Sequence, residues 1–270
     1  MSAGDHPLAR GELVTFSCTA GLGRVTLNRP EALNAWSLAF GRALTRVLVE
    51  EASAPEVRAV IIIGAGRAFS SGIDLRIGFS TGADGTHDLR EELDVHHGAI
   101  NATCALRKPV IAAVRGPAFG IGFSLALACD MIIASESAVF GPSWARFGLV
   151  PDGGSTLTLA TAIGHRRAFE LAALCKQLSG SQAAELGLAN RVVPDDALDA
   201  EAEAVAMRLA AGPTMAYAAL KDGLRAAVHG GFAGQLDVEE RLQTELARTT
   251  DFLEGVSAFR ESRPAVYTGA

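Results

Sequence analysis

The chain of 270 residues is poor in the features that mark disulfide-rich and metal-binding proteins. It has only four cysteines, at positions 18, 104, 129 and 175, without a Cys-x-x-Cys pair or a cysteine–histidine spacing typical of a metal site. We therefore expect reduced cysteines in the core of a cytosolic protein, and no bound metal.

Long hydrophobic runs and an excess of positive charge are also absent. No apolar run reaches the roughly 20 residues that a transmembrane helix needs, and residues 1–7 lack the basic start and apolar centre of a signal peptide. The 24 Lys and Arg are outnumbered by 30 Asp and Glu, which gives a net charge of −6. A general nucleic-acid surface needs clustered positive charge. These absences predict a cytoplasmic protein with neither a membrane nor a nucleic acid as its partner.

The sequence does contain enough apolar residues for a substantial core. A hydrophobic content of 49% and a charged content of 20% suit one large globular domain, with or without an appendage. Residues 11–28 read as a β-hairpin, and the apolar run 60–63 as a strand buried on both faces. Short strand–turn–helix units recur from 109 to about 193, which favours an α/β fold with right-handed crossovers.

The composition changes at two further places. Residues 78–88 are rich in Gly, Ser, Thr and Asp without periodicity, which is typical of a loop. Beyond Pro194 the pattern becomes wholly helical and rich in alanine. We therefore divide the chain into a core of residues 1–195 and a helical region of residues 196–270.

Two strand-like runs each lead into a glycine turn. The run 109–114 is followed by Gly-Pro-Ala-Phe-Gly-Ile-Gly at 116–122 and at once by a helical pattern of small residues. The run 57–64 is followed by Ser-Ser-Gly-Ile-Asp-Leu at 70–75. The start of a helix carries unpaired backbone N–H groups at the positive end of its dipole. The turn at 116–122, which leads into a helix, is therefore expected to aim donors into a cleft.

The two turns resemble the paired signatures of the crotonase (enoyl-CoA hydratase/isomerase) superfamily. Further motifs follow the family order: Asn-Arg-Pro-Glu-Ala-Leu-Asn at 28–34, Phe-Gly at 140–141, Gly-Leu-Val-Pro-Asp-Gly-Gly at 148–154, Ala-Ala-Glu-Leu-Gly-Leu-Ala at 183–189 and Glu-Gly-Val-Ser-Ala-Phe at 254–259. The resemblance implies the α/β crotonase (ClpP/crotonase-like) fold, a spiral of ββα units with a helical C-terminal trimerisation region. A homotrimer or homohexamer is therefore expected.

The same resemblance implies an acyl-CoA thioester as substrate and no separate cofactor. It places the thioester oxygen in an oxyanion hole made by the backbone N–H groups of Ile73 and Ile121. The implied substrate-binding residues are Ser71, Gly72, Asp74, Leu75, Arg76, His97, Gly120, Ser124, Trp144, Phe259 and Arg263. Ile121 departs from the family pattern, which usually has glycine there, and its β-branched side chain predicts a small or unusually posed acyl group.

The carboxylates of a typical hydratase are missing. The two glutamate positions of the family's hydratases correspond here to Ser124 and Trp144, and neither can act as a carboxylate base. Asp152 instead matches the position of the catalytic aspartate in some isomerases of the family. One carboxylate suffices for isomerisation because it removes a proton from one carbon and returns it to another. We therefore predict an enoyl-CoA isomerase with Asp152 as the proton shuttle.

Several alternatives stay open beside this prediction. The protein could be a hydratase of low activity, or a binding protein that has lost its catalytic acids. His97, Trp144 and Asp152 also resemble residues of 4-chlorobenzoyl-CoA dehalogenase, which uses its aspartate as a nucleophile. Asp152 could equally be an N-cap or turn residue before a helix that starts near Ser155, and His97 a satisfied helix residue.

Overall fold

The computed structural model describes residues 12–77, 88–212, 214–226, 240, 244, 247–248 and 250–265. Nearly all of the expected loop at 78–88 lies outside these residues. The strands are β1 (Val14–Thr19), β2 (Leu22–Leu27), β3 (Ala59–Gly64), β4 (Val110–Val114), β5 (Pro117–Phe119), β6 (Met131–Ser135), β7 (Val139–Gly141), β8 (Leu178–Ser179) and β9 (Arg191–Val193). The helices are η1 (Pro30–Ala32), α1 (Leu38–Arg46), η2 (Val47–Glu51), α2 (Arg90–Ala105), α3 (Ile121–Ala128), η3 (Trp144–Phe147), α4 (Ser155–Ile163), α5 (His165–Ala173), α6 (Gly180–Glu185), α7 (Leu198–Ala210), α8 (Thr214–Ala226) and α10 (Thr250–Arg260).

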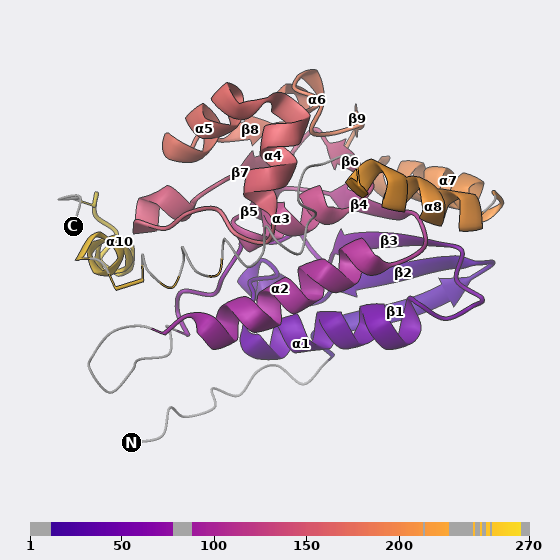
Figure 1. Cartoon of the computed structure of the whole chain (residues 1–270), viewed down its shortest axis with the longest axis horizontal. Helices are drawn as coiled ribbons and strands as arrows, with labels where there is room; N and C mark the ends of the chain where they lie inside the picture. Colours follow the sequence, from indigo (N-terminus) through magenta and orange to yellow (C-terminus); the bar gives the residue numbers. More distant parts are fainter. Residues whose placement is uncertain are drawn as a thin grey trace.

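A six-stranded sheet in the order β1-β2-β3-β4-β6-β9 forms the centre of the molecule (Figure 1). Strands β1 and β2 pair antiparallel, which confirms the predicted hairpin, and every other neighbouring pair is parallel. All six residues of β3 are buried, as the apolar run predicted. Val60 and Ile62 pack toward α1 and α2, whereas Ile61 and Ile63 pack toward α7, because successive side chains of a strand point to opposite faces.

A second, three-stranded sheet in the order β5-β7-β8 lies beside the first. The chain passes from a strand of the large sheet to one of the small sheet and then into a helix, in the runs β4–β5–α3 and β6–β7–α4. An isolated bridge between Ser70 and Ala118 also brings the glycine turn at 70–75, called the first glycine turn below, alongside β5. The expected ββα units are therefore present, and they place both glycine turns at one edge of the small sheet.

The helical C-terminal region is not a single layer. Helix α7 packs on the face of the large sheet opposite α1 and α2. Helix α8 is tied to the core by a buried lysine, Lys221, whose Nζ lies 2.7 Å from Asp130 Oδ2 and donates to the carbonyl of Lys108 at 2.9 Å. Helix α10 is set apart from both in Figure 1 and packs against η3. Each of these three helices therefore covers a different part of the core.

The cysteines are reduced, but one of them was placed wrongly by the sequence. Cys104 is buried, and Cys129 and Cys175 are partly buried, whereas Cys18 is exposed. Cys18 lies in β1, which is the edge strand of the large sheet, and the end of this strand faces solvent. The described residues contain neither a helix able to cross a membrane nor a group of three or more His, Cys, Asp and Glu side chains that could hold a metal ion.

Helix α2 buries His96 in an apolar setting that predicts sensitivity to acid. The ring packs edge-on against Trp36 with centroids 5.3 Å apart, and neither ring nitrogen makes a hydrogen bond of normal geometry within the described residues. Burial, helped by the charge of His97, lowers the pKa of His96 to about 3, and the backbone of Ser37 offsets this only in part. Below pH 6.5 the unfolded chain therefore protonates His96, whereas the folded protein keeps His96 neutral.

We expect the free energy of unfolding to fall as the pH drops below 6.5, with His96 contributing about 2 kcal/mol of the loss at pH 5. His96→Leu, which has a similar volume and no charge, should remove this part of the pH dependence. Urea unfolding at pH 7.5 and pH 5 measures it in both proteins. The exposed His165 serves as the control, because His165→Leu should keep the wild-type pH dependence. Equal losses in the wild type and in His96→Leu would contradict the prediction.

Candidate active site

The two glycine turns meet at one place. Ser70 donates its N–H to the carbonyl of Pro117 and accepts from the N–H of Phe119, both at 2.9 Å. Next to them, Gly72 has a φ of +90°, and a Cβ there would lie 2.8 Å from the carbonyl oxygen of Phe119 and 3.6 Å from the Cα of Gly120. Only glycine suits this close approach of two backbones. The two turns therefore hold the backbones of Ile73 and Ile121, which follow these glycines, near each other.

The N–H of Ile73 points away from Trp36, the residue with which Ile73 forms an isolated β-bridge. Trp36 pairs with this segment by donating to the carbonyl of Gly72 at 2.8 Å and accepting from the N–H of Asp74 at 2.9 Å. Successive residues of an extended segment direct their N–H groups to opposite sides. The N–H of Ile73 therefore faces away from Trp36.

The N–H of Ile121 is the first donor of α3. Gly120, with a φ of +52°, donates its own N–H to the carbonyl of Gly141 at 3.1 Å, while its carbonyl accepts from Phe123 and Ser124. A first-turn N–H has no acceptor within its helix and lies at the positive end of the dipole. Ile73 and Ile121 both line one cavity of about 540 Å³. Two main-chain donors beside one cavity can stabilise a negatively charged oxygen.

Most of the predicted substrate-binding residues line this cavity. They are Ser71, Gly72, Asp74, Leu75, Arg76, Gly120, Trp144 and Phe259. The sequence analysis missed other lining residues, among them Arg67, Ser143, Arg146, Phe147 and Leu149. Arg67 precedes the first glycine turn by three residues and Arg146 lies in η3, so a search for basic residues next to the motifs could have found both.

Asp74 anchors the first turn rather than carrying a proton. Its carboxylate accepts from Nε and Nη2 of Arg76, both at 2.9 Å, and lies 2.8 Å from Nη2 of Arg29. Burial alone would raise the pKa of Asp74, but the hydrogen bonds from Arg76 and the two guanidinium charges outweigh it and hold the pKa below its usual range. Asp74 is therefore charged at neutral pH. Arg76 stays largely exposed at the rim of the cavity, where an anionic group could reach it.

Asp152 lies behind the cavity, on the turn before α4. The residue is 1% exposed and does not line the cavity. Its main-chain carbonyl accepts from the hydroxyls of Ser124 at 2.9 Å and Ser155 at 2.7 Å, and the N–H of the adjacent Gly153 is directed at Nε2 of His97 at 3.4 Å. Side chains from α2, α3 and α4 thus hold this turn in place.

Asp152 lies in the turn before α4, as one part of the alternative reading expected, but it is not the N-cap residue. Helix α4 begins at Ser155, as expected, and its N-cap residue is Gly154, which has no side chain that could cap the helix. Gly154 has a φ of +75° and Gly153 a φ of +60°, so the turn bends sharply between the aspartate and the helix. Asp152 therefore lies two residues before the N-cap residue, in a turn.

Ser124 and His97 also lie away from the cavity, although the sequence analysis grouped them with the substrate-binding residues. Both are buried, Ser124 on α3 and His97 on α2, and neither lines the cavity. Nε2 of His97 lies 3.4 Å from the main-chain nitrogen of Gly153 and accepts from its N–H. The structure brings Ser124, His97 and Asp152 together in one buried cluster.

The C-terminal residues separate into two groups. Phe259 lines the cavity and packs edge-on against Phe147, with ring centroids 5.6 Å apart. Arg263 does not line the cavity but is engaged on the surface by Glu254 at 2.6 Å and Glu261 at 2.7 Å, and these hydrogen bonds raise the pKa of its guanidinium. Within one chain, Arg263 thus binds its own acidic neighbours.

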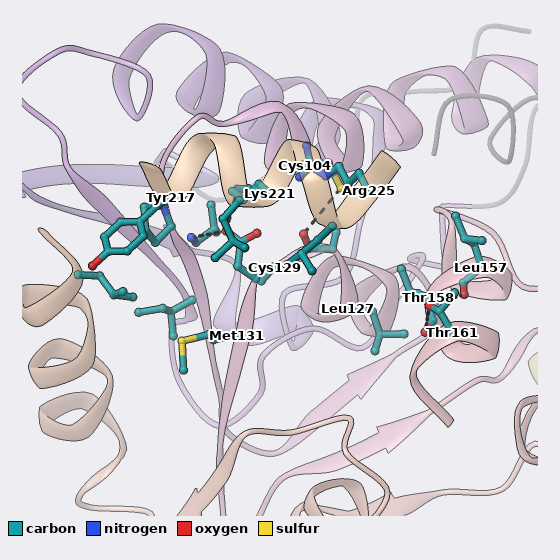
Figure 2. A pocket seen from close by; sticks show the side chains of 18 residues that line it. Cys104, Leu127, Cys129, Met131, Leu157, Thr158, Thr161, Tyr217, Lys221 and Arg225 are labelled. Atoms are coloured by element: carbon teal, nitrogen blue, oxygen red, sulfur yellow. Dashed lines mark hydrogen bonds and ion pairs between the residues drawn. The ribbon is translucent and has the colours of Figure 1, made fainter. Parts of the chain in front are cut away.

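A second cavity, of about 410 Å³, lies between α3, α4 and α8 (Figure 2). Lys221 on its wall is already paired with Asp130. Burial raises the pKa of the Cys104 thiol to about 11 and that of Cys129 well above its usual value, so neither is a thiolate at neutral pH. Neither thiol can therefore act as a nucleophile in this cavity at neutral pH.

The comparisons with known proteins identify the family of this chain. Residues 17–270 match the family model for enoyl-CoA hydratase/isomerase. A probable enoyl-CoA hydratase of Rhodobacter capsulatus is 41% identical, with 95% of this chain and 98% of the relative covered. The 1,2-epoxyphenylacetyl-CoA isomerase of Escherichia coli is 35% identical, with 96% and 99% covered.

A solved structure is also similar to this chain. The crystal structure of an enoyl-CoA hydratase from Mycobacterium avium subsp. paratuberculosis has a TM-score of 0.85 and 35% identity, and the match covers 97% of this chain and 100% of that one. The strand order, the ββα units and the paired glycine turns described above fit the fold predicted from the sequence. The chain therefore belongs to the enoyl-CoA hydratase/isomerase family and has the crotonase fold.

Proposed function

We propose that this family member isomerises an enoyl-CoA type thioester, with Asp152 as the proton shuttle. The observation that carries the proposal is the position of Asp152 on the turn directly behind Ile121, where Gly153 approaches the Ile121 side chain. The two positions that hold glutamates in hydratases are a serine and a tryptophan, Ser124 and Trp144. The named isomerase among the relatives supports the same reaction class.

The proposed reaction needs one carboxylate and two main-chain donors. The carboxylate of Asp152 removes a proton from the carbon next to the thioester carbonyl, and the negative charge moves onto the thioester oxygen. The N–H groups of Ile73 and Ile121 stabilise this dienolate, each by about 2.7–4 kcal/mol. Asp152 then returns the proton further along the acyl chain, so the double bond shifts and no atom is gained or lost. No separate cofactor takes part.

A weak hydratase is the second candidate, favoured by the names of several relatives. Hydration needs groups that deprotonate water and protonate the α-carbon, and each typically contributes about 10²–10⁴-fold. Ser124 cannot serve because its hydroxyl donates to the main chain of Asp152, and the indole of Trp144 is not a base at neutral pH. The arrangement therefore supports isomerisation better than hydration.

We expect hydration of crotonyl-CoA to be far slower than the turnover of about 10 s⁻¹ that is typical of enzymes, while a 3-enoyl-CoA is isomerised and exchanges its α-protons for deuterium. Both reactions are followed with the same preparation, by absorbance and by mass spectrometry. Hydration at about 10 s⁻¹ or faster would contradict the proposal. Binding without any deuterium exchange would indicate a non-catalytic acyl-CoA-binding protein, and a covalent ester on Asp152 would indicate dehalogenase-like chemistry.

The oligomeric state and location stay predictions. We propose a homotrimer or homohexamer, supported by large apolar side chains on the surface, namely Phe169 on α5 and Leu220 and Leu224 on α8, which are 57–67% exposed. Burial of these side chains between subunits would remove apolar area from water. We also propose a cytoplasmic location, supported by the reduced cysteines.

A further inference from the structure

Ile121 serves the site with two different parts of the residue. Its N–H belongs to the unpaired first turn of α3, whereas its side chain extends to the turn that carries Asp152. A Cβ added at Gly153 would lie only 2.9 Å from Cδ1 of Ile121 and 2.8 Å from Cβ of Ser124. The side chain of Ile121 is therefore packed directly against the backbone of Gly153.

The cavity lined by Ile73 and Ile121 ends at the contact between the Ile121 side chain and Gly153. Ile121 and Trp144 are both among its lining residues, but Ser124, Asp152 and Gly153 are not. Asp152 and Ile121 are each 1% exposed, and Trp144 is 6% exposed, so this end of the cavity is closely packed. The Ile121 side chain thus closes this end of the cavity, next to the turn formed by Asp152 and Gly153.

The position of the donors determines what this wall does to a bound acyl group. A thioester oxygen held at the N–H groups of Ile73 and Ile121 brings the first acyl carbons beside the Ile121 side chain. The far end of a longer acyl chain must then displace that side chain, which Gly153 backs closely. Overpacking of this kind is unfavourable in a close-packed interior.

We infer that the side chain of Ile121 is a specificity-determining wall, which limits the length of the acyl group. This inference rests on the proposed function, because it needs an acyl-CoA thioester bound at the two donors. It predicts a chain length above which affinity falls. Shortening the side chain at position 121 should move that limit to longer acyl groups.

The test measures the dissociation constants of saturated acyl-CoA thioesters of increasing chain length by titration calorimetry, so it does not depend on turnover. Ile121→Val removes the methyl group that contacts Gly153, and Ile121→Ala removes most of the wall. For the first chain length that the wild type rejects, we expect about tenfold tighter binding by Ile121→Ala and a smaller gain for Ile121→Val. Short acyl groups should bind nearly as in the wild type.

Ile163 provides the matched control. It is a buried isoleucine on α4 that does not line the cavity, so Ile163→Val and Ile163→Ala loosen the core without changing the wall. Their chain-length limit should equal that of the wild type. An unchanged limit in both Ile121 variants, or an equal change in the Ile163 variants, would overturn the inference and leave the proposed function intact. A wild-type protein that binds no acyl-CoA of any length would overturn both.

Discussion

Replacing Ile121 with proline should reduce turnover by about 10²–10³-fold while leaving most of the affinity for CoA thioesters, because proline removes one of the two N–H donors. Position 121 is the first residue of α3, where a helix tolerates proline. The preceding Gly120 has φ +52° and ψ −130°, outside the α region that a following proline disfavours. The fold should therefore survive.

Ile121→Ala is the matched control, because it also shortens the side chain but keeps the N–H group. Both variants are compared on the same short acyl-CoA, by steady-state kinetics and by calorimetry. The difference in turnover between them reports the donor alone. Equal turnover of the proline and alanine variants would show that the N–H of Ile121 does not stabilise the enolate, and the oxyanion-hole assignment would fail.

Replacing Asp152 with asparagine should lower the isomerisation rate by about 10²–10⁴-fold, because an amide cannot take up and return the proton. The folded structure should be retained. The hydrogen bonds from Ser124 and Ser155 end on the main-chain carbonyl of residue 152, and the N-cap residue of α4 is Gly154. Urea unfolding and acyl-CoA binding close to the wild type would confirm that only the chemistry is lost.

Asp196→Asn makes the same chemical change at an exposed aspartate and should leave the isomerisation rate unaltered. If Asp152→Asn folds, binds acyl-CoA and keeps its full isomerase activity, Asp152 has no catalytic role. The proton carrier would then have to be sought among the groups around it, and His97 would be the first candidate. The substitution also separates an enzyme from a binding protein, which should bind equally well without the carboxylate.

The local elements of this fold were predictable because their signals are local. The alternation of residues 14–27, the apolar run that forms β3 and the glycine turn before α3 each depend on a few neighbouring residues. Even so, the geometry of the first long helix changes along its length. Val47 and Leu48 are buried, but α1 ends at Arg46 and the chain continues as the π-helical turn η2.

The sequence by itself determined the family, the two glycine turns and the absence of glutamates at the hydratase positions, because these depend on residue identity and order. Only the tertiary structure decided how the site is arranged. Asp152 is buried, and its turn is held by a hydrogen bond from Ser124 to Asp152 and by one from Gly153 to His97, which join positions 28 and 56 apart along the chain. Arg67 and Arg146 line the same cavity as the two donors, although neither arginine lies in one of the motifs. Exposure and access arise from the packing of segments that are distant in the sequence, and no local pattern records them.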